Sequence, residues 1–430
     1  MTPEPVRIGV LGCGNVGAAL VGLVDTRAAA IAARTGLRLD ITRVAVRSVA
    51  KERPIEPPPG VLTHDAAEVV VDPGIDVVVE LIGGIEPARE LVLAAVRAGK
   101  PVVTANKELL ANHGAELFAA AEAAGVDLLF EAAVGGGIPF IRPLRESLAG
   151  ERIDRLIGIV NGTTNYILTR MTEAGVTYAE ALTEAQSMGY AERDPTADVE
   201  GHDAAAKAAI IASIAFGVRV TQGEVYSEGI SGITAADIAY ARKLGLTIKL
   251  LAIAERHDDE VAVRVHPALV PLEHPLASVR DSFNAIFVEG DAVGELMFYG
   301  RGAGGSPTAS AVLGDLIDAA ANRAKGGHAS VGTLAKTRIS PIDEVRSAYY
   351  LNVDVIDRPG VLAAVAGALG NHGVSIRSME QEGLGGEARI VFITHEAREA
   401  DLRATIRDLH QLDAVDRITS VLRVVGDSDR

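Results

Sequence analysis

Residues 185–207 have the side-chain types and the spacing that proton transfer beside bound charge requires. The segment is rich in carboxylates and continues into an alanine-rich stretch with a single lysine, Lys207. On a helix, Asp203 and Lys207 are four residues apart, so they lie on one face and can touch. Lysine can donate and accept a proton, and burial readily tunes its proton affinity. The spacing favours a catalytic lysine, and an ordinary surface ion pair is the alternative.

The elements that position these side chains follow from neighbouring residues. Asp194-Pro195 indicates a turn or a helix start, because proline at a first helical position gives up a donor that would be unpaired there. The stretch after Lys207, AAIIASIAFGV, is apolar nearly all round and predicts a buried helix. A lysine that enters such a helix needs a partner or a chemical role.

This segment resembles the signature of homoserine dehydrogenases. The matching positions are Ala185, Gly189, Tyr190, Ala191, Asp194, Pro195, Asp198, Val199, Gly201, Asp203 and Lys207. The resemblance covers essentially the whole chain. It implies reversible NAD(P)-dependent reduction of L-aspartate 4-semialdehyde to L-homoserine, a step in threonine, methionine and isoleucine biosynthesis. It also implies the monofunctional form, since no aspartokinase-like segment precedes the nucleotide domain.

The family's chemistry implies roles for particular residues. The hydride comes from the nicotinamide, so the protein must bind, orient and manage a proton. We expect Lys207 to donate and accept that proton, and Lys107, in the tetrapeptide TANK, to position the substrate and favour the oxyanion. The carboxylates expected near the substrate's amino group, together with the glycine of the preceding turn, are Glu192, Asp203, Asp198 and Gly189.

A dinucleotide-binding loop is predicted near the N-terminus. VRIGVLG indicates a buried strand that leads into GCGNVG, residues 12–17, and then into a helix. A GxGxxG motif needs this context, because its glycines let the backbone approach a pyrophosphate at the helix N-terminus. The expected cofactor contacts here and at later strand ends and loops are Gly12, Gly14, Asn15, Val16, Gly17, Arg47, Lys51, Ile82, Lys107 and Gly304.

The end of the second predicted strand bears on cofactor choice. An NAD-selective fold commonly has an acid there for the ribose hydroxyls, whereas this chain has Arg47, with Lys51 nearby. Basic side chains suit a 2′-phosphate, so we expect NADP, with NAD as the alternative.

Strands and helices alternate through residues 1–138, which predicts an α/β, doubly wound domain of the Rossmann type. We expect an α+β substrate and dimerisation domain at 139–321, a linker at 322–347 and a further domain at 348–430. A glycine-rich turn closes the first domain, and there the resemblance implies a monovalent cation site for Na⁺. Its ligands would be Glu131 and the backbone carbonyls of Val134, Gly136 and Ile138.

The last domain has predicted elements in the order β-α-β-β-α-β, which is ferredoxin-like. With DRPGVL and NHGVSI it resembles an ACT domain, a small amino-acid-sensing module. The resemblance implies an effector region with threonine as the ligand, and an ACT fold kept only for oligomerisation is the alternative. The candidate regulatory residues are Asp357, Gly360, Asn371 and Val374.

Composition restricts the partners. The formal net charge of -16 argues against nucleic acid or an anionic membrane, since both need basic patches. The N-terminus lacks the features of a secretion signal, and no run is long and apolar enough to span a bilayer. We therefore expect a cytoplasmic homodimer or homotetramer that binds small molecules.

The residues present exclude some other functions and leave two alternatives. A cysteine-dependent semialdehyde dehydrogenase is excluded, because the only cysteine, Cys13, lies inside the cofactor loop. None of the ten histidines has a metal-binding spacing such as HExxH. The alternatives are another NAD(P)-dependent hydroxy-acid dehydrogenase with an ACT tail and a non-catalytic amino-acid-sensing protein.

Overall fold

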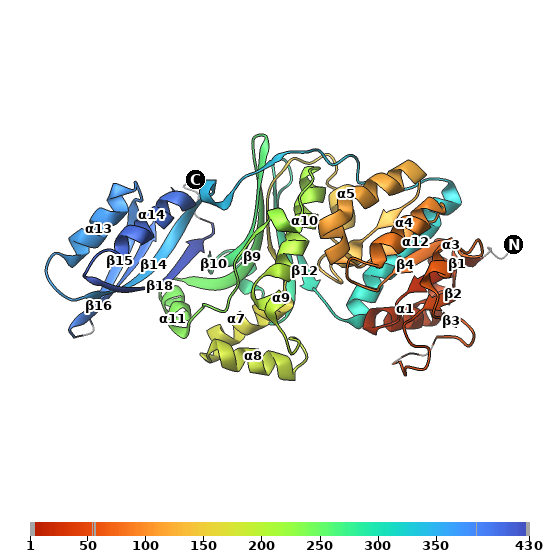
Figure 1. The fold of residues 1–430 in the computed structure, drawn as a ribbon, viewed down its shortest axis with the longest axis horizontal. Coiled ribbons are helices and arrows are strands. Elements are labelled where there is room, and N and C mark those ends of the chain that lie inside the picture. Colours follow the sequence, from red (N-terminus) through yellow and green to blue (C-terminus); the bar gives the residue numbers. More distant parts are fainter. Residues whose placement is uncertain (1–4, 54, 56, 384, 427–430) are drawn as a thin grey trace. The chain divides into compact units, whose positions relative to one another are not determined.

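A computed structural model describes residues 5–53, 55, 57–383 and 385–426 (Figure 1). These residues form two compact units. The first unit takes its described residues from Met1–Val160, Ala205–Val225 and Phe283–Thr337, and the second from Asn161–Ala204, Tyr226–Ser282 and Arg338–Arg430. The outermost residues of the predicted terminal domains, 1–4 and 427–430, lie outside the described part.

A six-stranded parallel sheet forms the centre of the first unit, in the order β3-β2-β1-β4-β5-β6. Its strands are β1 (Pro5–Leu11), β2 (Arg38–Ala45), β3 (Leu62–Thr63), β4 (Val77–Glu80), β5 (Val102–Thr104) and β6 (Leu128–Leu129). This order reverses direction beside β1, which is the switch point where doubly wound sheets bind dinucleotides. The predicted Rossmann-type sheet is confirmed.

Helices connect these strands. They also cover the sheet, because each helix presents an apolar stripe to it. They are α1 (Asn15–Thr26), α2 (Ala28–Thr35), α3 (Ala66–Val71), α4 (Ala88–Arg97), α5 (Lys107–Ala124) and α6 (Ile141–Arg145), with the short η1 (Glu131–Ala133) before α6. Among the described residues no single helix is long and apolar enough to cross a membrane, although α1 and α2, bent by 67°, satisfy length and composition as a pair.

One more helix of this unit comes from far along the chain. α12 (Gly305–Lys325) packs beside α1, and its buried residues Val312, Leu313 and Leu316 join Ile8 and Val10 of β1 in one core. α12 also continues past residue 322, where the linker was predicted to begin. The nucleotide-binding unit is therefore completed by a helix that begins inside the predicted substrate region, 139–321.

The first unit also contains three antiparallel strands and two helical segments. The strands are β7 (Ile153–Ile159), β11 (Phe283–Gly290) and β12 (Gly294–Arg301), with β11 in the middle. The buried helix predicted after the acidic segment is α10 (His202–Phe216), of which residues 205–216 belong to this unit, and η2 (Gln222–Glu224) follows it.

The second unit begins with helices and a long hairpin. Its elements up to the last module are α7 (Gly162–Ala174), α8 (Tyr178–Ser187), α9 (Thr196–Val199), β8 (Tyr226–Ser227), α11 (Ala235–Lys243), β9 (Leu246–His257), β10 (Glu260–Pro271), η3 (Pro275–Ser278) and β13 (Arg338–Ile339). β9 and β10 pair antiparallel along their whole length. Most of their side chains are buried on both faces, as expected for strands inside a packed unit.

The C-terminal module follows in the predicted order β-α-β-β-α-β. It comprises η4 (Ile342–Glu344), β14 (Arg346–Ile356), α13 (Val361–Asn371), β15 (Ile376–Gly383), β16 (Glu387–Thr394), β17 (Ala397–Arg398), α14 (Glu399–Leu409) and β18 (Val415–Val424). Its sheet has the order β18-β14-β16-β15, and its edge strand β18 also pairs with β10. The ferredoxin-like fold is confirmed, and the module shares a compact unit with the β9–β10 hairpin.

Candidate active site

The loop between β1 and α1 has the shape that a dinucleotide pyrophosphate needs. Gly12 has a φ of 99°, and a Cβ there would lie 2.7 Å from the carbonyl oxygen of Leu81. A Cβ at Gly17 would collide with the carbonyl of Gly12, whereas Gly14 faces open space. Gly14 precedes α1 without a side-chain cap, so the first N–H groups of α1, at Asn15 and Val16, are available to an anion.

A cavity of about 440 Å³ extends from this loop past the end of β2. Its lining includes Gly12, Gly14, Ile82 and the basic residues Arg47, Lys51, Arg53 and His64. Arg53 stabilises the loop after β2, because its guanidinium donates to the carbonyls of Ser48 and Lys51 at 2.5 and 2.7 Å. Within the described residues, the side chains of Arg47 and Lys51 have no hydrogen-bond or ion-pair partner, so both are available to a ligand's phosphate.

A second cavity, of about 280 Å³, brings the two candidate lysines together inside the first unit. Lys107 and Lys207 line it with Val16, Ile82 and Gly136. Lys207 is 8% exposed, and its Nζ donates to the carbonyl oxygen of Val160, just after β7, at 2.7 Å. Lys107 is half-buried at the start of α5. Two ammonium groups therefore face one space beside the dinucleotide loop.

Three polar residues that the sequence analysis did not select hold the ends of β4 and β5 in place. Glu80 is fully buried, and its carboxylate accepts from the backbone N–H of Ile82 at 2.7 Å and from Thr104 Oγ1 at 2.6 Å. Asn106 caps α5 by accepting from Leu109 N–H at 3.0 Å and donates to the Gly84 carbonyl at 2.7 Å. The sequence does contain a signal for Glu80, because it is an acidic residue at the end of an otherwise apolar strand, VVVE.

In the second unit, Asn161 joins two carboxylates of the acidic segment. Its Nδ2 donates to Asp198 at 2.7 Å and to Asp203 at 2.9 Å. Its Oδ1 accepts from Thr164 N–H at 2.9 Å and so caps α7. Asn161 is not among the site residues predicted from the sequence, although it directly precedes the helix start GTT. The helix cap thus fixes the position of both carboxylates.

The other two substrate-binding candidates, Glu192 and Gly189, have no hydrogen bond to Asn161 or its two carboxylates in the described part of the chain. Glu192 is exposed, and among the described residues its carboxylate has no hydrogen bond or ion pair; its backbone carbonyl accepts from Gln186 at 3.1 Å. Gly189 has a φ of 75° in the turn after α8, a left-handed conformation that favours glycine. Gly189 therefore has a backbone role in this turn.

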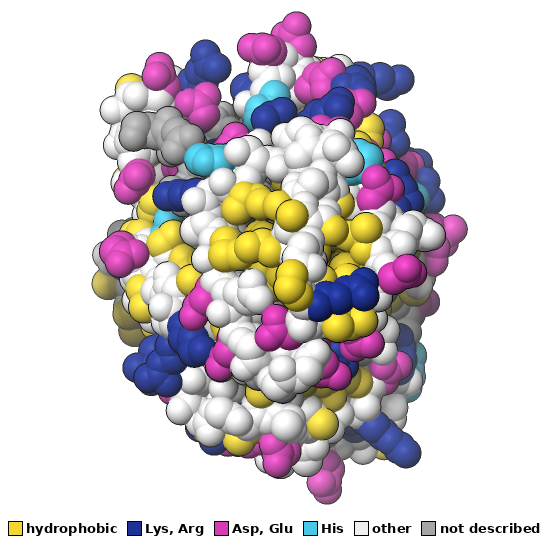
Figure 2. All heavy atoms as spheres, turned by 90° about the vertical axis from the view of Figure 1, so that its left-hand side faces the viewer, with side chains coloured by type: hydrophobic (Ala, Val, Ile, Leu, Met, Phe, Trp, Pro, Cys, Tyr) yellow, Lys and Arg dark blue, Asp and Glu magenta, His cyan; other side chains and the backbone are white. Residues whose placement is uncertain are grey.

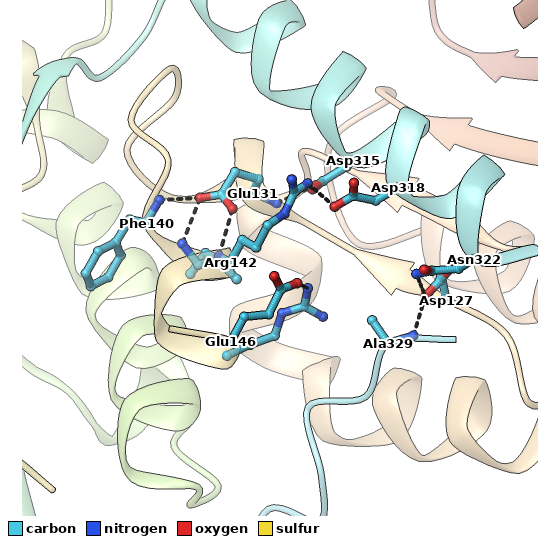
Figure 3. Close-up of polar contacts among 11 residues, drawn as sticks. Asp127, Glu131, Phe140, Arg142, Glu146, Asp315, Asp318, Asn322 and Ala329 are labelled. Carbon is cyan, nitrogen blue, oxygen red and sulfur yellow. Dashed lines mark hydrogen bonds and ion pairs between the residues drawn. The ribbon is translucent and has the colours of Figure 1, made fainter. Parts of the chain in front are cut away.

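The predicted cation ligands include one buried carboxylate, Glu131 (Figure 3). Glu131 accepts from the backbone N–H groups of Phe140, Ile141 and Arg142, so it satisfies the first turn of α6. Within the described part of the chain, the carbonyl oxygens of Val134, Gly136 and Ile138 accept no hydrogen bond. Buried acceptors without donors fit a monovalent cation, which prefers oxygen ligands.

Beside Glu131, Asp315 of α12 accepts from the Glu131 backbone N–H at 2.7 Å, and Arg142 reaches both Asp315 and Asp318 (Figure 3). Burial raises the pKa of Asp315 to about 7. These contacts fasten α12 to the end of the parallel sheet.

Gly304 has a φ of 121° and precedes α12, while its neighbours Gly302 and Ala303 line the cavity of the two lysines. A Cβ at Gly305 would lie 3.2 Å from the carbonyl oxygen of Asn15. The loop thus lies directly against the dinucleotide-binding turn.

The candidate regulatory residues lie at the two ends of α13. Asp357 and Gly360 precede the helix, whereas Asn371 ends it and Val374 follows, buried. Because α13 has 11 residues, roughly 16 Å separates the two groups. A single free amino acid is too short to contact both groups of one chain.

Known proteins similar to this chain are homoserine dehydrogenases. The family models "Homoserine dehydrogenase, NAD binding domain", "Homoserine dehydrogenase" and "ACT domain" match residues 12–131, 139–317 and 349–414. The homoserine dehydrogenase of Corynebacterium glutamicum is 52% identical over 98% of this chain and 96% of its own length.

Solved structures agree. A crystal structure of a homoserine dehydrogenase from Thiobacillus denitrificans has a TM-score of 0.93 at 45% identity, with 98% of each chain covered. A hyperthermophilic archaeal homoserine dehydrogenase in complex with NADPH has a TM-score of 0.63 at 29% identity and covers 74% of this chain and 98% of that one.

Proposed function

This chain belongs to the homoserine dehydrogenase family of oxidoreductases, with an NAD(P)-binding domain and an ACT domain, and we propose that it reduces L-aspartate 4-semialdehyde reversibly to L-homoserine for threonine, methionine and isoleucine biosynthesis. The observation that carries this proposal is the cavity where Lys107 and Lys207 meet beside the dinucleotide loop. Such a cavity suits a carbonyl that acquires negative charge during reduction.

In the proposed mechanism, a bound nicotinamide supplies the hydride. The ammonium group of Lys207 donates a proton to the substrate's aldehyde oxygen, and the amine accepts it in the reverse direction. The Val160 carbonyl holds Lys207 Nζ in a fixed direction. Lys107 stabilises negative charge on the same oxygen.

For the substrate's amino group we assign Asp203, which lies one helical turn before Lys207 on α10. Asn161 Nδ2 donates to both Asp203 and Asp198, so we assign Asp198 the role of a partner that orients and polarises Asp203 through that amide. Glu192 and Gly189 remain proposed substrate contacts from the resemblance alone.

NADP is the proposed cofactor, because Arg47 and Lys51 line the cavity at the end of β2. The NADPH complex of the archaeal relative agrees with this choice. We also propose a Na⁺ site at Glu131, Val134, Gly136 and Ile138, where the unpaired carbonyls supply oxygen ligands.

Threonine feedback through the ACT domain is proposed as well, in a cytoplasmic homo-oligomer. Figure 2 shows hydrophobic side chains gathered on one face of the protein, and the C-terminal module has exposed apolar residues of its own. On α13 of that module, Leu362 is 39% exposed and Ala363 and Ala364 are exposed too. Exposed apolar patches commonly mark contacts between proteins, which supports association through this module.

The test of the proposed activity is the absorbance of NADPH formed from NADP and L-homoserine. Lys207→Ala should lower kcat by about 100-fold or more, as loss of a general acid–base group does. Its NADP affinity should remain near that of the unaltered chain. Lys243→Ala, which removes a 55% exposed lysine, is the matched control. A Lys207→Ala protein with full turnover would refute the assigned role.

A further inference from the structure

A third cavity, of about 350 Å³, lies in the first unit between α5 and α10. It shares no lining residue with the two cavities of the active site. Its apolar walls come from Leu110 and Phe118 of α5, Ile210 and Ile214 of α10, and Val220 and Leu334. This volume is within the range of small-molecule sites, and the proposed reaction makes no use of it.

The walls of this cavity are fixed by hydrogen bonds. Ser213 Oγ accepts from Val220 N–H at 3.1 Å, which holds the segment after α10 against the helix. Ala335 N–H donates to Gly217 at 2.8 Å, and Arg219 N–H donates to Ala335 at 2.8 Å, so the chain around Leu334 is fastened too. The cavity is therefore formed before any ligand arrives.

A glycine keeps the space open. Gly114 lies in the interior of α5, where glycine costs roughly 0.5–1 kcal/mol relative to alanine. Its φ is that of an ordinary helix, so the backbone does not require glycine. A Cβ at this position would come 3.2 Å from the Phe118 ring and would occupy the cavity wall.

One cation at the cavity is available to an anion. The Arg219 guanidinium has no hydrogen-bond or ion-pair partner in the described part of the chain. The one carboxylate in the lining, Glu116, already pairs with Arg89 at 2.6 Å. Asn112 Nδ2 donates to the Glu108 carbonyl at 2.8 Å. A ligand with an apolar part and a carboxylate at one end would match the apolar walls and the guanidinium of this cavity.

We propose that this cavity binds a small amphiphilic carboxylate, with its carboxylate on Arg219 and its apolar part between α5 and α10. Lys107 lies on α5 and Lys207 on α10, so the ligand would contact both helices that carry the active-site lysines. Binding at this site does not depend on the proposed reaction, so the two proposals can fail separately.

The test is calorimetric titration of the full chain, saturated with NADP, with 4-phenylbutanoate as the probe. We expect saturable binding of one probe per chain, at least tenfold weaker in Arg219→Met and restored in Arg219→Lys. The uncharged 4-phenylbutan-1-ol should bind at least tenfold more weakly than the acid. Gly114→Leu should abolish binding, whereas Ala119→Leu, on the exposed face of α5, should leave it unchanged.

No saturable binding of the acid would overturn the proposal. Equal affinity of the Arg219→Met variant would overturn it as well, because binding would then occur elsewhere. Since Arg219 is exposed, its replacement should not affect folding, and this variant decides the matter even if Gly114→Leu does not fold.

Discussion

At the scale of single residues, two buried lysines in the described part of the chain donate to neutral oxygen acceptors. Lys207 Nζ donates to the Val160 carbonyl, and Lys249 of β9 donates to Asn165 Oδ1 at 3.1 Å and to the Val279 carbonyl. A neutral acceptor orients an ammonium group without neutralising it. The Val160 carbonyl thus fixes the direction of the Lys207 ammonium group, which the proposed proton transfer requires.

Arg47 should discriminate between cofactors. Arg47→Ala removes a charge-assisted contact to a 2′-phosphate, worth about 1.5–3 kcal/mol, so NADP should bind roughly 10- to 100-fold more weakly while NAD changes little. Fluorescence titration with both cofactors measures this. Arg43→Ala, an exposed arginine of the same strand, is the control. Equal losses for NADP and NAD would contradict the NADP assignment.

Lys249 should make the free energy of unfolding depend on pH in the alkaline range. Burial lowers its pKa from 10.5 to about 8. Between these values the unfolded chain keeps a proton that the folded chain has lost, so this group makes stability rise with pH, by at most about 1.4 kcal/mol per unit.

Urea unfolding of Lys249→Met across this pH range should lack that rise. The exposed Lys243→Met should keep it. A Lys249→Met protein with an unchanged pH profile would show that the ammonium group titrates normally in the folded chain.

At the scale of elements, helix starts position the candidate site. Asn106 begins α5 next to Lys107, Asn161 begins α7 and holds two carboxylates, and Gly304 begins α12 beside the dinucleotide loop. The start of a helix leaves N–H groups unpaired, and a capping side chain satisfies one of them. In this fold the caps at α5 and α7 also fix the neighbouring functional groups.

A substitution of Asn161 can test its two roles separately, namely capping α7 and holding two carboxylates. Asn161→Asp keeps the acceptor for Thr164 N–H but replaces the donor to Asp198 and Asp203 with a third carboxylate. We expect kcat/KM for L-homoserine to fall at least tenfold while NADP affinity is kept. Thr177→Ala, which removes the cap of α8, should cost about 1 kcal/mol in stability and leave kcat/KM unchanged. If both variants behave alike, Asn161 only stabilises its helix.

At the scale of the whole molecule, a cluster of buried charged residues joins the ACT module to the rest of the second unit. Arg423 of β18 donates to Glu399 of α14 at 2.8 Å and to Glu228, after β8, at 2.9 Å. Its side chain is 7% exposed, and that of Glu399 is 6% exposed. The β18–β10 pairing lies at the same place. The module and the β9–β10 hairpin should therefore unfold together.

Removing Arg423 should reveal this coupling. Arg423→Met leaves Glu399 buried without its partner, so the free energy of unfolding should fall by about 3–5 kcal/mol in urea. Arg417→Met, on the same strand with a 65% exposed side chain, should cost at most about 1 kcal/mol. Equal effects of the two changes would mean that the Arg423 cluster does not join the module to its unit.

The sequence by itself determined the dinucleotide loop, the parallel sheet, the ferredoxin-like module and the buried helix that carries Lys207. These features depend on periodicity and on local sterics, which a short window of residues contains. The predicted domain boundaries stay a prediction.

Only the tertiary structure decided that Lys107 and Lys207 line one cavity, that Asn161 joins Asp198 to Asp203, and that α12 returns to the nucleotide-binding core. It also left Glu192 exposed and placed the regulatory candidates at opposite ends of α13. The reason is that each of these contacts, or its absence, depends on how segments distant in the chain pack together, and no local pattern encodes that packing.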